Sequence, residues 1–308
     1  MPFISPSDIT FSLIPEATFA TTPTTGATRY ELPVKADQAP LAYSTNNIDS
    51  ETKRPNRSSN GSRRGMGQAQ GSFEFRLSNA TYLTPLFQSA LSGTFVSKVL
   101  KGGSTDTTFS VLCKLIDGAA GSALVQQVKG CMVNSMTISG EQNAEVNVSF
   151  ELMGAARDML TTDNALAVAA VPNTAVEFIG KEVTAFNVAG NTSLNVSAFE
   201  LVVGHERALR GVFGSDAGVG FGTSGTRGTT LELTVYRESG LLETLTTGAA
   251  QAVSFQIGST GNGWSISLPA AYIQVPQDSL DGESAFVTLN MTAGYDATSG
   301  TDIIITQL

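Results

Sequence analysis

The chain has 308 residues, enough for two domains of ordinary size that each bury a core. Hydrophobic residues make up 41% and charged residues only 15%. Such a weakly charged surface suits a protein packed against copies of itself, although a Gly/Ser/Thr-rich β protein would have a similar composition. A net charge of −9 excludes a general electrostatic attraction for nucleic acid.

The acidic excess is confined to the second half of the chain. Residues 1–155 carry 12 Lys+Arg and 12 Asp+Glu, which leaves 6 and 15 of the totals of 18 and 27 for residues 156–308.

Two cysteines, Cys113 and Cys131, give no disulfide framework. Cys113 falls in phase with Phe109 and Val111 of a predicted strand, which indicates an unreactive core thiol.

Neither a membrane span nor a secretory signal is predicted. No apolar run is long enough to cross a bilayer. The first residues lack the basic and apolar regions of a signal peptide. We therefore expect folding and assembly in a cytoplasm, with no membrane partner.

The N-terminal region predicts one short strand followed by a long polar excursion. Residues 9–14 form the strand, and apolar residues nearly vanish between positions 37 and 71. Residues 56–65 have no helical or strand period and are rich in turn formers, so residues 51–71 are predicted to form a long basic loop. It is either a solvated excursion or an arm that orders against a neighbouring subunit, and its basic residues are Lys53, Arg54, Arg57, Arg63 and Arg64.

A strand, a helix and a further strand follow. Residues 72–77 alternate, with Phe73, Phe75 and Leu77 inward. A short helix begins at Thr84-Pro85, where Thr can cap it, and ends at Gly93. Two to three turns are too few to be stable alone, so the helix must lie on the sheet. Residues 108–115 give the next strand.

The clearest pattern is a hairpin over residues 130–154. Its second strand turns Val146, Val148, Phe150 and Leu152 to one side and polar residues to the other. The polar residues 140–143 supply the turn.

After a linker at residues 156–173, with a possible short helix around 165–171, the second half repeats this plan. Residues 73–77 align in phase with 231–235, and residues 144–151 align with 285–292. A second short helix is expected at 241–248, and residues 211–228 form an irregular Gly-rich loop that echoes the basic loop. Residues 253–257 and 264–268 give two further strands. The match is one of pattern and order, with no long run of identities.

Residue types typical of catalysis are scattered. The one histidine, His205, has no cysteine cluster beside it and cannot make a zinc site of usual ligand count. Gly218–Gly222 resembles a phosphate-binding loop but lacks its lysine and a surrounding βαβ unit. Trp264 is expected in the core. We therefore predict no catalytic, cofactor-binding or metal-binding residues.

These segments resemble the major tail tube proteins of long, non-contractile-tailed bacteriophages. Glu16–Pro23 (EATFATTP) is similar to a Glu-x-Thr-x-Gly-x-x-Pro segment near their N-terminus, with Ala20 in place of the usual glycine. The strand at 72–77, the helix at 83–93 and the hairpin at 130–154 follow in the family's order. The resemblance covers residues 5–154, and reaches the second half through the repeat.

The resemblance implies a mainly β fold built from a β-sandwich or barrel-like domain with a short flanking helix, and the repeat predicts two such domains in tandem. They would be residues 1–155, with the N-terminal arm and basic loop, and residues 174–308. It implies a structural virion protein that assembles in the host cytoplasm into stacked rings forming the tail tube. A two-domain chain would fill a pseudo-sixfold ring with three copies. The alternative ring is a hexamer with the second half outside as decoration.

The expected partners are the chain itself, the tape-measure, tail terminator and distal tail proteins, and phage DNA that passes without sequence-specific binding. The basic loop would contact the adjacent ring. Competing interpretations are a capsid decoration or baseplate protein, and a self-assembling surface-fibre subunit, which should carry a secretion signal.

Overall fold

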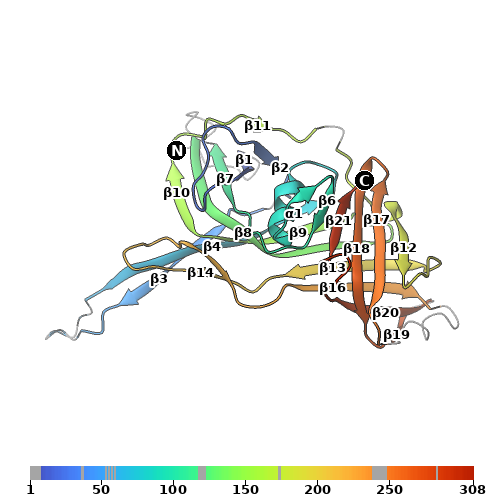
Figure 1. Ribbon diagram of the computed structural model, residues 1–308. Coiled ribbons are helices and arrows are strands. Elements are labelled where there is room, and N and C mark those ends of the chain that lie inside the picture. The colour runs from blue at the N-terminus through green and yellow to red at the C-terminus, as the bar shows by residue number, and fades with distance from the viewer. Residues whose placement is uncertain are drawn as a thin grey trace.

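The computed structural model describes residues 8–308, apart from 36–37, 53, 55, 57, 59, 117–122, 173–174, 238–247 and 282–283. Strands dominate it, with one α-helix among the described residues (Figure 1). The elements of the first half are β1 (Ile9–Pro15), β2 (Arg29–Leu32), β3 (Ala42–Asp49), β4 (Ser62–Arg76), α1 (Leu83–Leu91), β5 (Phe95–Val96), β6 (Val99–Lys101), β7 (Phe109–Ile116), β8 (Ala123–Glu141), β9 (Asn147–Gly154), β10 (Ala156–Leu160) and β11 (Val168–Ala169).

The second half begins with a 3-10 turn and continues in strands. Its elements are η2 (Gly180–Glu182), β12 (Val183–Val188), β13 (Val196–Gly204), β14 (Arg207–Arg210), β15 (Gly220–Thr223), β16 (Gly228–Tyr236), β17 (Gln251–Ser259), β18 (Asn262–Ile273), β19 (Gln277–Asp281), β20 (Ser284–Ala293) and β21 (Ile304–Gln307).

Each half is a continuous run of antiparallel strands. In the first half the order of neighbours is β1-β7-β8-β9-β4-β3. In the second half it is β12-β17-β18-β20-β16-β13. The long strand β8 pairs with β7 along its first part and with β9 along its second part, so it carries the chain from one layer to the other.

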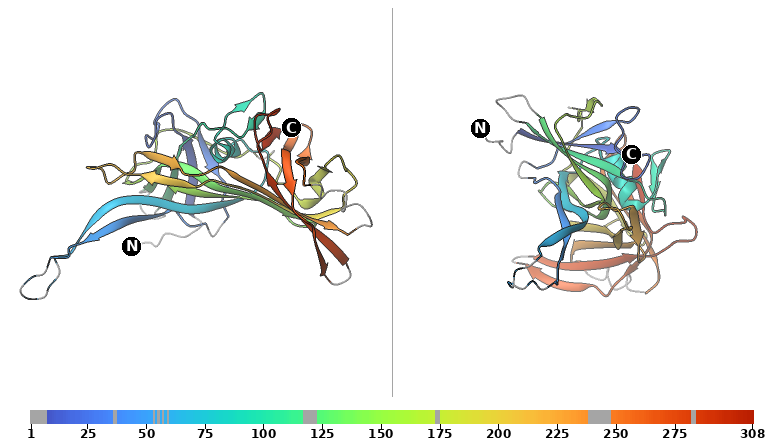
Figure 2. Two further views of the ribbon diagram at one scale, coloured as in Figure 1. Left: turned by 60° about the horizontal axis from the view of Figure 1, so that its bottom comes forward. Right: turned by 90° about the vertical axis from the view of Figure 1, so that its left-hand side faces the viewer.

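The two halves join edge to edge through β8 and β13. Ser135–Glu141 of β8 pairs with Ala198–Gly204 of β13, which makes one long sheet that spans both halves (Figure 2, left). A second link pairs β6 with β21. The hydrophobic core is also continuous across the halves, because Trp264 packs edge-on against Phe87 of α1 at 5.0 Å between ring centroids.

The strands with one buried face were predicted correctly. Phe73, Phe75 and Leu77 are buried, as are Val146, Val148, Phe150 and Leu152. The expected hairpin is formed by β8 and β9. Cys113, Cys131 and Trp264 are also buried, as expected.

Helix α1 was predicted with the wrong ends. No side chain caps its start at Tyr82, and Thr84 lies inside the first turn. The left-handed residue at its end is Ser92, with φ 48°. Gly93 is needed for a different reason, since a Cβ there would meet the Lys101 carbonyl oxygen at 2.3 Å. The second expected helix, at 241–248, falls almost wholly outside the described residues.

Three segments predicted without strands contain them. Strand β4 begins at Ser62, inside the predicted loop 51–71, and pairs with β3. The predicted linker contains β10, paired with β8, and β11, paired with β2. The predicted loop 211–228 contains β15, paired with β14. These pairs lie at the edges of the body and mostly lack a buried face, so no apolar alternation marks them in the sequence.

Candidate assembly surfaces

One face of the long sheet is polar along strands of both halves. Asn147, Ser149 and Glu151 point outward from β9, opposite its buried residues. The same face continues onto Glu200 of β13 and Glu232 of β16, which are exposed. A depression of about 480 Å³ lies over it, lined by residues that include Glu141, Glu145, Glu200 and Glu232.

The charge on this face differs between the two halves. Glu200 lies directly opposite Glu232 in the β13–β16 register, and neither forms an ion pair within the described residues. On β4, Glu74 pairs with Lys35, and Arg76 bridges Glu145 and Glu177. The first half therefore pairs Glu74 and Glu145 on this face with basic side chains, whereas the second half leaves a like-charge pair.

A long hairpin of β3 and β4, the arm, projects from the body (Figure 1; Figure 2, left). Its side chains are mostly exposed on both faces from Ser62 to Arg64. Its base is held by Tyr43, whose ring covers Gly67 where no side chain would fit, and by Arg157, 4.8 Å from the Tyr43 ring centroid. The predicted loop is thus a paired strand over much of its length.

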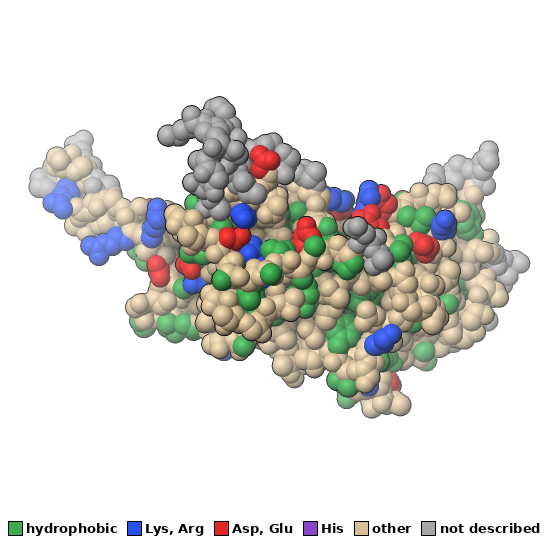
Figure 3. Space-filling model, turned by 90° about the horizontal axis from the view of Figure 1, so that it is seen from above, with side chains coloured by type: hydrophobic (Ala, Val, Ile, Leu, Met, Phe, Trp, Pro, Cys, Tyr) green, Lys and Arg blue, Asp and Glu red, His purple; other side chains and the backbone are tan. Residues whose placement is uncertain are grey.

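The structure places three of the five predicted contact residues on the arm. Arg63 and Arg64 lie on β4 opposite Ile48 and Asn47, and Arg54 near the tip donates to Asn60. Figure 3 shows basic side chains along this projection. Lys53 and Arg57 lie outside the described residues. An exposed arm with basic side chains is suited to an acidic protein surface.

The joint between the halves is fastened by cationic residues at the end of α1. Arg207 donates to the carbonyl oxygens of Val133 and Ser89 (3.3 Å), to the Ser92 hydroxyl (2.7 Å) and to Asp106 (3.1 Å). A carbonyl-rich helix end favours positive charge. This buried guanidinium therefore joins the second half to the first.

His205 and Arg227 complete this group, which we call the α1 clamp (His205, Arg207 and Arg227). His205 Nε2 donates to Ala90 O at 2.6 Å, and Arg227 donates to Leu91 O at 3.0 Å. Burial lowers the pKa of His205, and Arg207 lowers it further, which favours the neutral ring. The lone histidine predicted to lie outside any zinc site is thus a structural contact. Sequence reasoning missed both arginines, because their partners lie far away along the chain.

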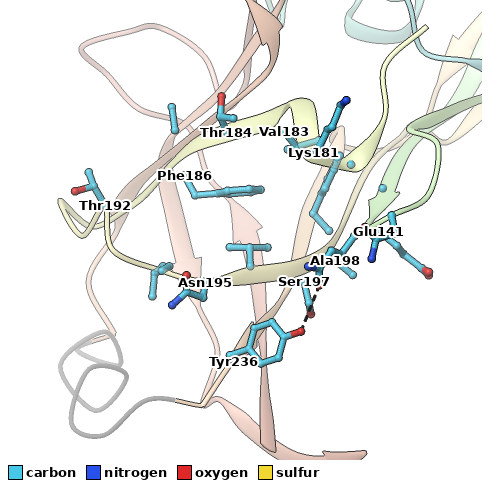
Figure 4. A pocket seen from close by; sticks show the side chains of 18 residues that line it. Glu141, Lys181, Val183, Thr184, Phe186, Thr192, Asn195, Ser197, Ala198 and Tyr236 are labelled. Carbon is cyan, nitrogen blue, oxygen red and sulfur yellow. Dashed lines mark hydrogen bonds between the residues drawn. The ribbon is translucent and has the colours of Figure 1, made fainter. Parts of the chain in front are cut away.

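A pocket of about 480 Å³ opens at one end of this joint (Figure 4). Phe186 of β12 and Tyr236 of β16 face it, with Lys181 and Glu141 at its rim. The Tyr236 hydroxyl donates to the Gln142 side chain at 3.3 Å. Within the described residues no group of three or more His, Cys, Asp or Glu side chains could hold a metal ion. The pocket is a seam between the two halves with mixed polar and aromatic walls.

The N-terminal segment is fixed by a carboxylate. Glu16 accepts hydrogen bonds from the Ala20 and Gly130 backbone N–H groups, each at 3.0 Å, and from the hydroxyls of Thr108 and Ser110. Ala20 adopts a left-handed conformation with φ 53°. That conformation explains why glycine suits this position of the motif.

The cysteines are buried and free. Burial raises the pKa of Cys113 to about 12, and burial also raises the pKa of Cys131. Both thiols therefore stay protonated near neutral pH.

The glycine-rich segment that resembles a phosphate loop contributes Gly220 and Gly222 to β15, where they lie opposite Arg210 and Ala208 of β14.

Comparison with known proteins assigns the family. The model of the phage tail tube protein family matches residues 6–298, nearly the whole chain and both halves. No curated protein matches the chain. Within the described part of the structure no helix is long and apolar enough to cross a membrane. The chain therefore belongs to the phage tail tube protein family, and is a β-rich structural component of the virion tail.

Proposed function

We propose that three copies of this chain close into a ring and that the rings stack into the tube that conducts the genome from capsid to host cell. Each half would act as one of six equivalent units. The proposal extends to a long, non-contractile tail. It rests on how closely the two halves agree in strand order and register.

The register agreement is the observation that carries the proposal. Phe73 lies opposite Phe150, and the aligned Leu231 lies opposite Met291. Two positions further on, Phe75 lies opposite Val148, and the aligned Leu233 lies opposite Leu289. A one-residue slip would turn every side chain to the other face, so a shared register over aligned sequences supports two equivalent units.

The strand order points the same way. The first half runs β1-β7-β8-β9-β4-β3 and the second β12-β17-β18-β20-β16-β13, with each strand matching its counterpart in pairing and chain order. The halves also lie beside each other in one sheet through β8 and β13. Neighbours around a ring share that relation, whereas a decoration domain outside a hexamer would not.

The arm suits contact between successive rings. The tip of the arm lies beyond the first residue of β4. The β8–β9 turn lies beyond the last residue of β4, Arg76, which is opposite Asn147 in the β4–β9 register. Arms and turns thus sit at opposite ends of the same strands. In a stack, the basic arm residues of one ring would reach the turn end of the next, where Glu141 and Glu177 are exposed and Glu182 is half-buried.

The polar face of the long sheet would line the bore. Its carboxylates, Glu200 and Glu232 above all, would repel DNA phosphate and let the duplex slide without sequence-specific contact. The role is structural and not enzymatic. The tape-measure, tail terminator and distal tail proteins would be the other partners.

Electron microscopy of the purified protein tests the proposal against the competing virion roles. We expect rings or hollow tubes with a bore wide enough for a duplex. Solid fibres would favour a surface-fibre subunit. Monomers that never associate at high concentration would favour a decoration or baseplate protein, and either result would overturn the tube.

A further inference from the structure

From the β8–β13 joint we infer which edges join successive copies and in which register: residues 273–277 of one copy, which run into β19, pair antiparallel with residues 38–42 of the next, with Gln277 opposite Gln38. This inference rests on the proposed ring. It goes further by naming the partner edge residue by residue.

The first edge is identified through β4 and β16. Glu200 lies opposite Glu232, and Gly204 opposite Gly228. The aligned positions on β4 are Glu74 and Gln70, and Gln70 lies opposite Ala42. Counting back four residues from Ala42 in the same register places Gln38 opposite Glu74. Gln38 is therefore the first-half equivalent of Glu200, which lies opposite Glu232. The Gln38 side chain donates to Ser72 O at 2.7 Å, which holds this segment along β4.

The second edge is identified through β9 and β20. Ser139 lies opposite Asn147, and Gln277 lies opposite Thr288. Asn147 and Thr288 occupy the same position in the two aligned strands. Gln277 of β19 therefore matches Ser139 of β8. Within the chain Ser139 pairs with Glu200, so between copies Gln277 should pair with Gln38.

Both edges are uncovered where their counterparts are covered. Ile138 of β8 and Leu201 of β13 are both fully buried at the in-chain joint. On the matching edges Ala39 and Ala42 are exposed, as are Gln274, Val275 and Gln277, and β19 pairs with β20 alone among the described strands. Val275 is 81% exposed there. An open strand edge with apolar side chains invites pairing with another chain, and a closed ring removes it.

Disulfide trapping tests the register. Directly opposed residues in an antiparallel pair lie within the Cα separation that a disulfide needs, about 4.4–6.8 Å. We expect Gln38→Cys/Gln277→Cys tubes to yield, after oxidation, covalent dimers and trimers, with trimers as the largest species. The matched control, Ser44→Cys/Gln277→Cys, moves one thiol six residues along the same edge, about 20 Å, and should stay monomeric.

The outcomes separate the inference from the proposed function. Tubes that form without the 38–277 cross-link, or that cross-link equally in the control, overturn the register and leave the tube intact. A parent chain that makes no tube overturns both. If the double variant does not assemble, hydrogen exchange on the parent decides. Residues 38–42 and 275–277 should gain at least tenfold protection on assembly, and unchanged exchange there would overturn the inference.

Discussion

The β8–β13 joint inside the chain and the two open edges, at residues 38–42 and at the start of β19, have the same strand arrangement but different chemistry. Seven residue pairs, none with proline, join β8 to β13, and the α1 clamp ties the same joint to the end of the helix. The open edges each carry a proline, Pro40 and Pro276, that cannot donate to a ladder. The difference suggests a permanent joint within the chain and edges that stay unpaired until copies meet.

Loss of the clamp should give the largest effect. Arg207 is buried and serves two carbonyl oxygens, a hydroxyl and Asp106. Arg207→Met should lower the free energy of unfolding by about 3 kcal/mol, because buried acceptors and a carboxylate lose their partner. Denaturant unfolding measures this loss. Arg210→Met, at an exposed position at the other end of the same strand, is the control, and equal losses would refute a special role for the clamp.

Neutralising the arm should separate stacking from folding. Replacement of Arg54, Arg57, Arg63 and Arg64 by glutamine should shorten tubes several-fold. It should change the free energy of unfolding by less than about 0.5 kcal/mol, as expected for surface substitutions. Tube lengths come from electron micrographs and stability from thermal unfolding. Tubes of normal length would remove the arm from the contact between rings.

Acid should weaken the ion pair between Asp302 and Arg227 of the α1 clamp. Burial alone would raise the pKa of Asp302, but its hydrogen bond and ion pair with Arg227 bring the net pKa below the usual value. A folded-state pKa below the unfolded one gives stability above about pH 4 that is lost as the pH falls through the folded value. Unfolding measured between pH 6 and 3 should show this loss, and Asp302→Asn should flatten it. An unaltered slope in the variant would contradict the assignment.

The facing carboxylates of the second half should give the smallest effect. Like charges directly opposite in a sheet are destabilising, so Glu200→Gln should stabilise the monomer by a few tenths of a kcal/mol. Glu74→Gln, at the first-half position aligned with Glu232, removes an ion pair with Lys35 and should bring no gain. Equal effects at the two positions would show that the charge contrast between the halves is energetically unimportant.

The sequence predicted the parts of the fold that bury one face. Phe73, Phe150 and Leu231 alternate with polar neighbours, so their strands and the repeat could be found from periodicity. The arm, β10 and the β14–β15 hairpin could not, because they are held by backbone pairing at the edge of the body. The α1 clamp was equally hidden, since Arg207 lies more than 110 residues from Ser89 and Ser92.

A rotational symmetry count on end-on images of the tube tests the equivalence of the two halves most directly. The account predicts three chains per ring, with six similar sheets around the bore and the halves related by a turn of about 60°. Six chains per ring, with the second halves projecting outside the tube wall, would contradict it.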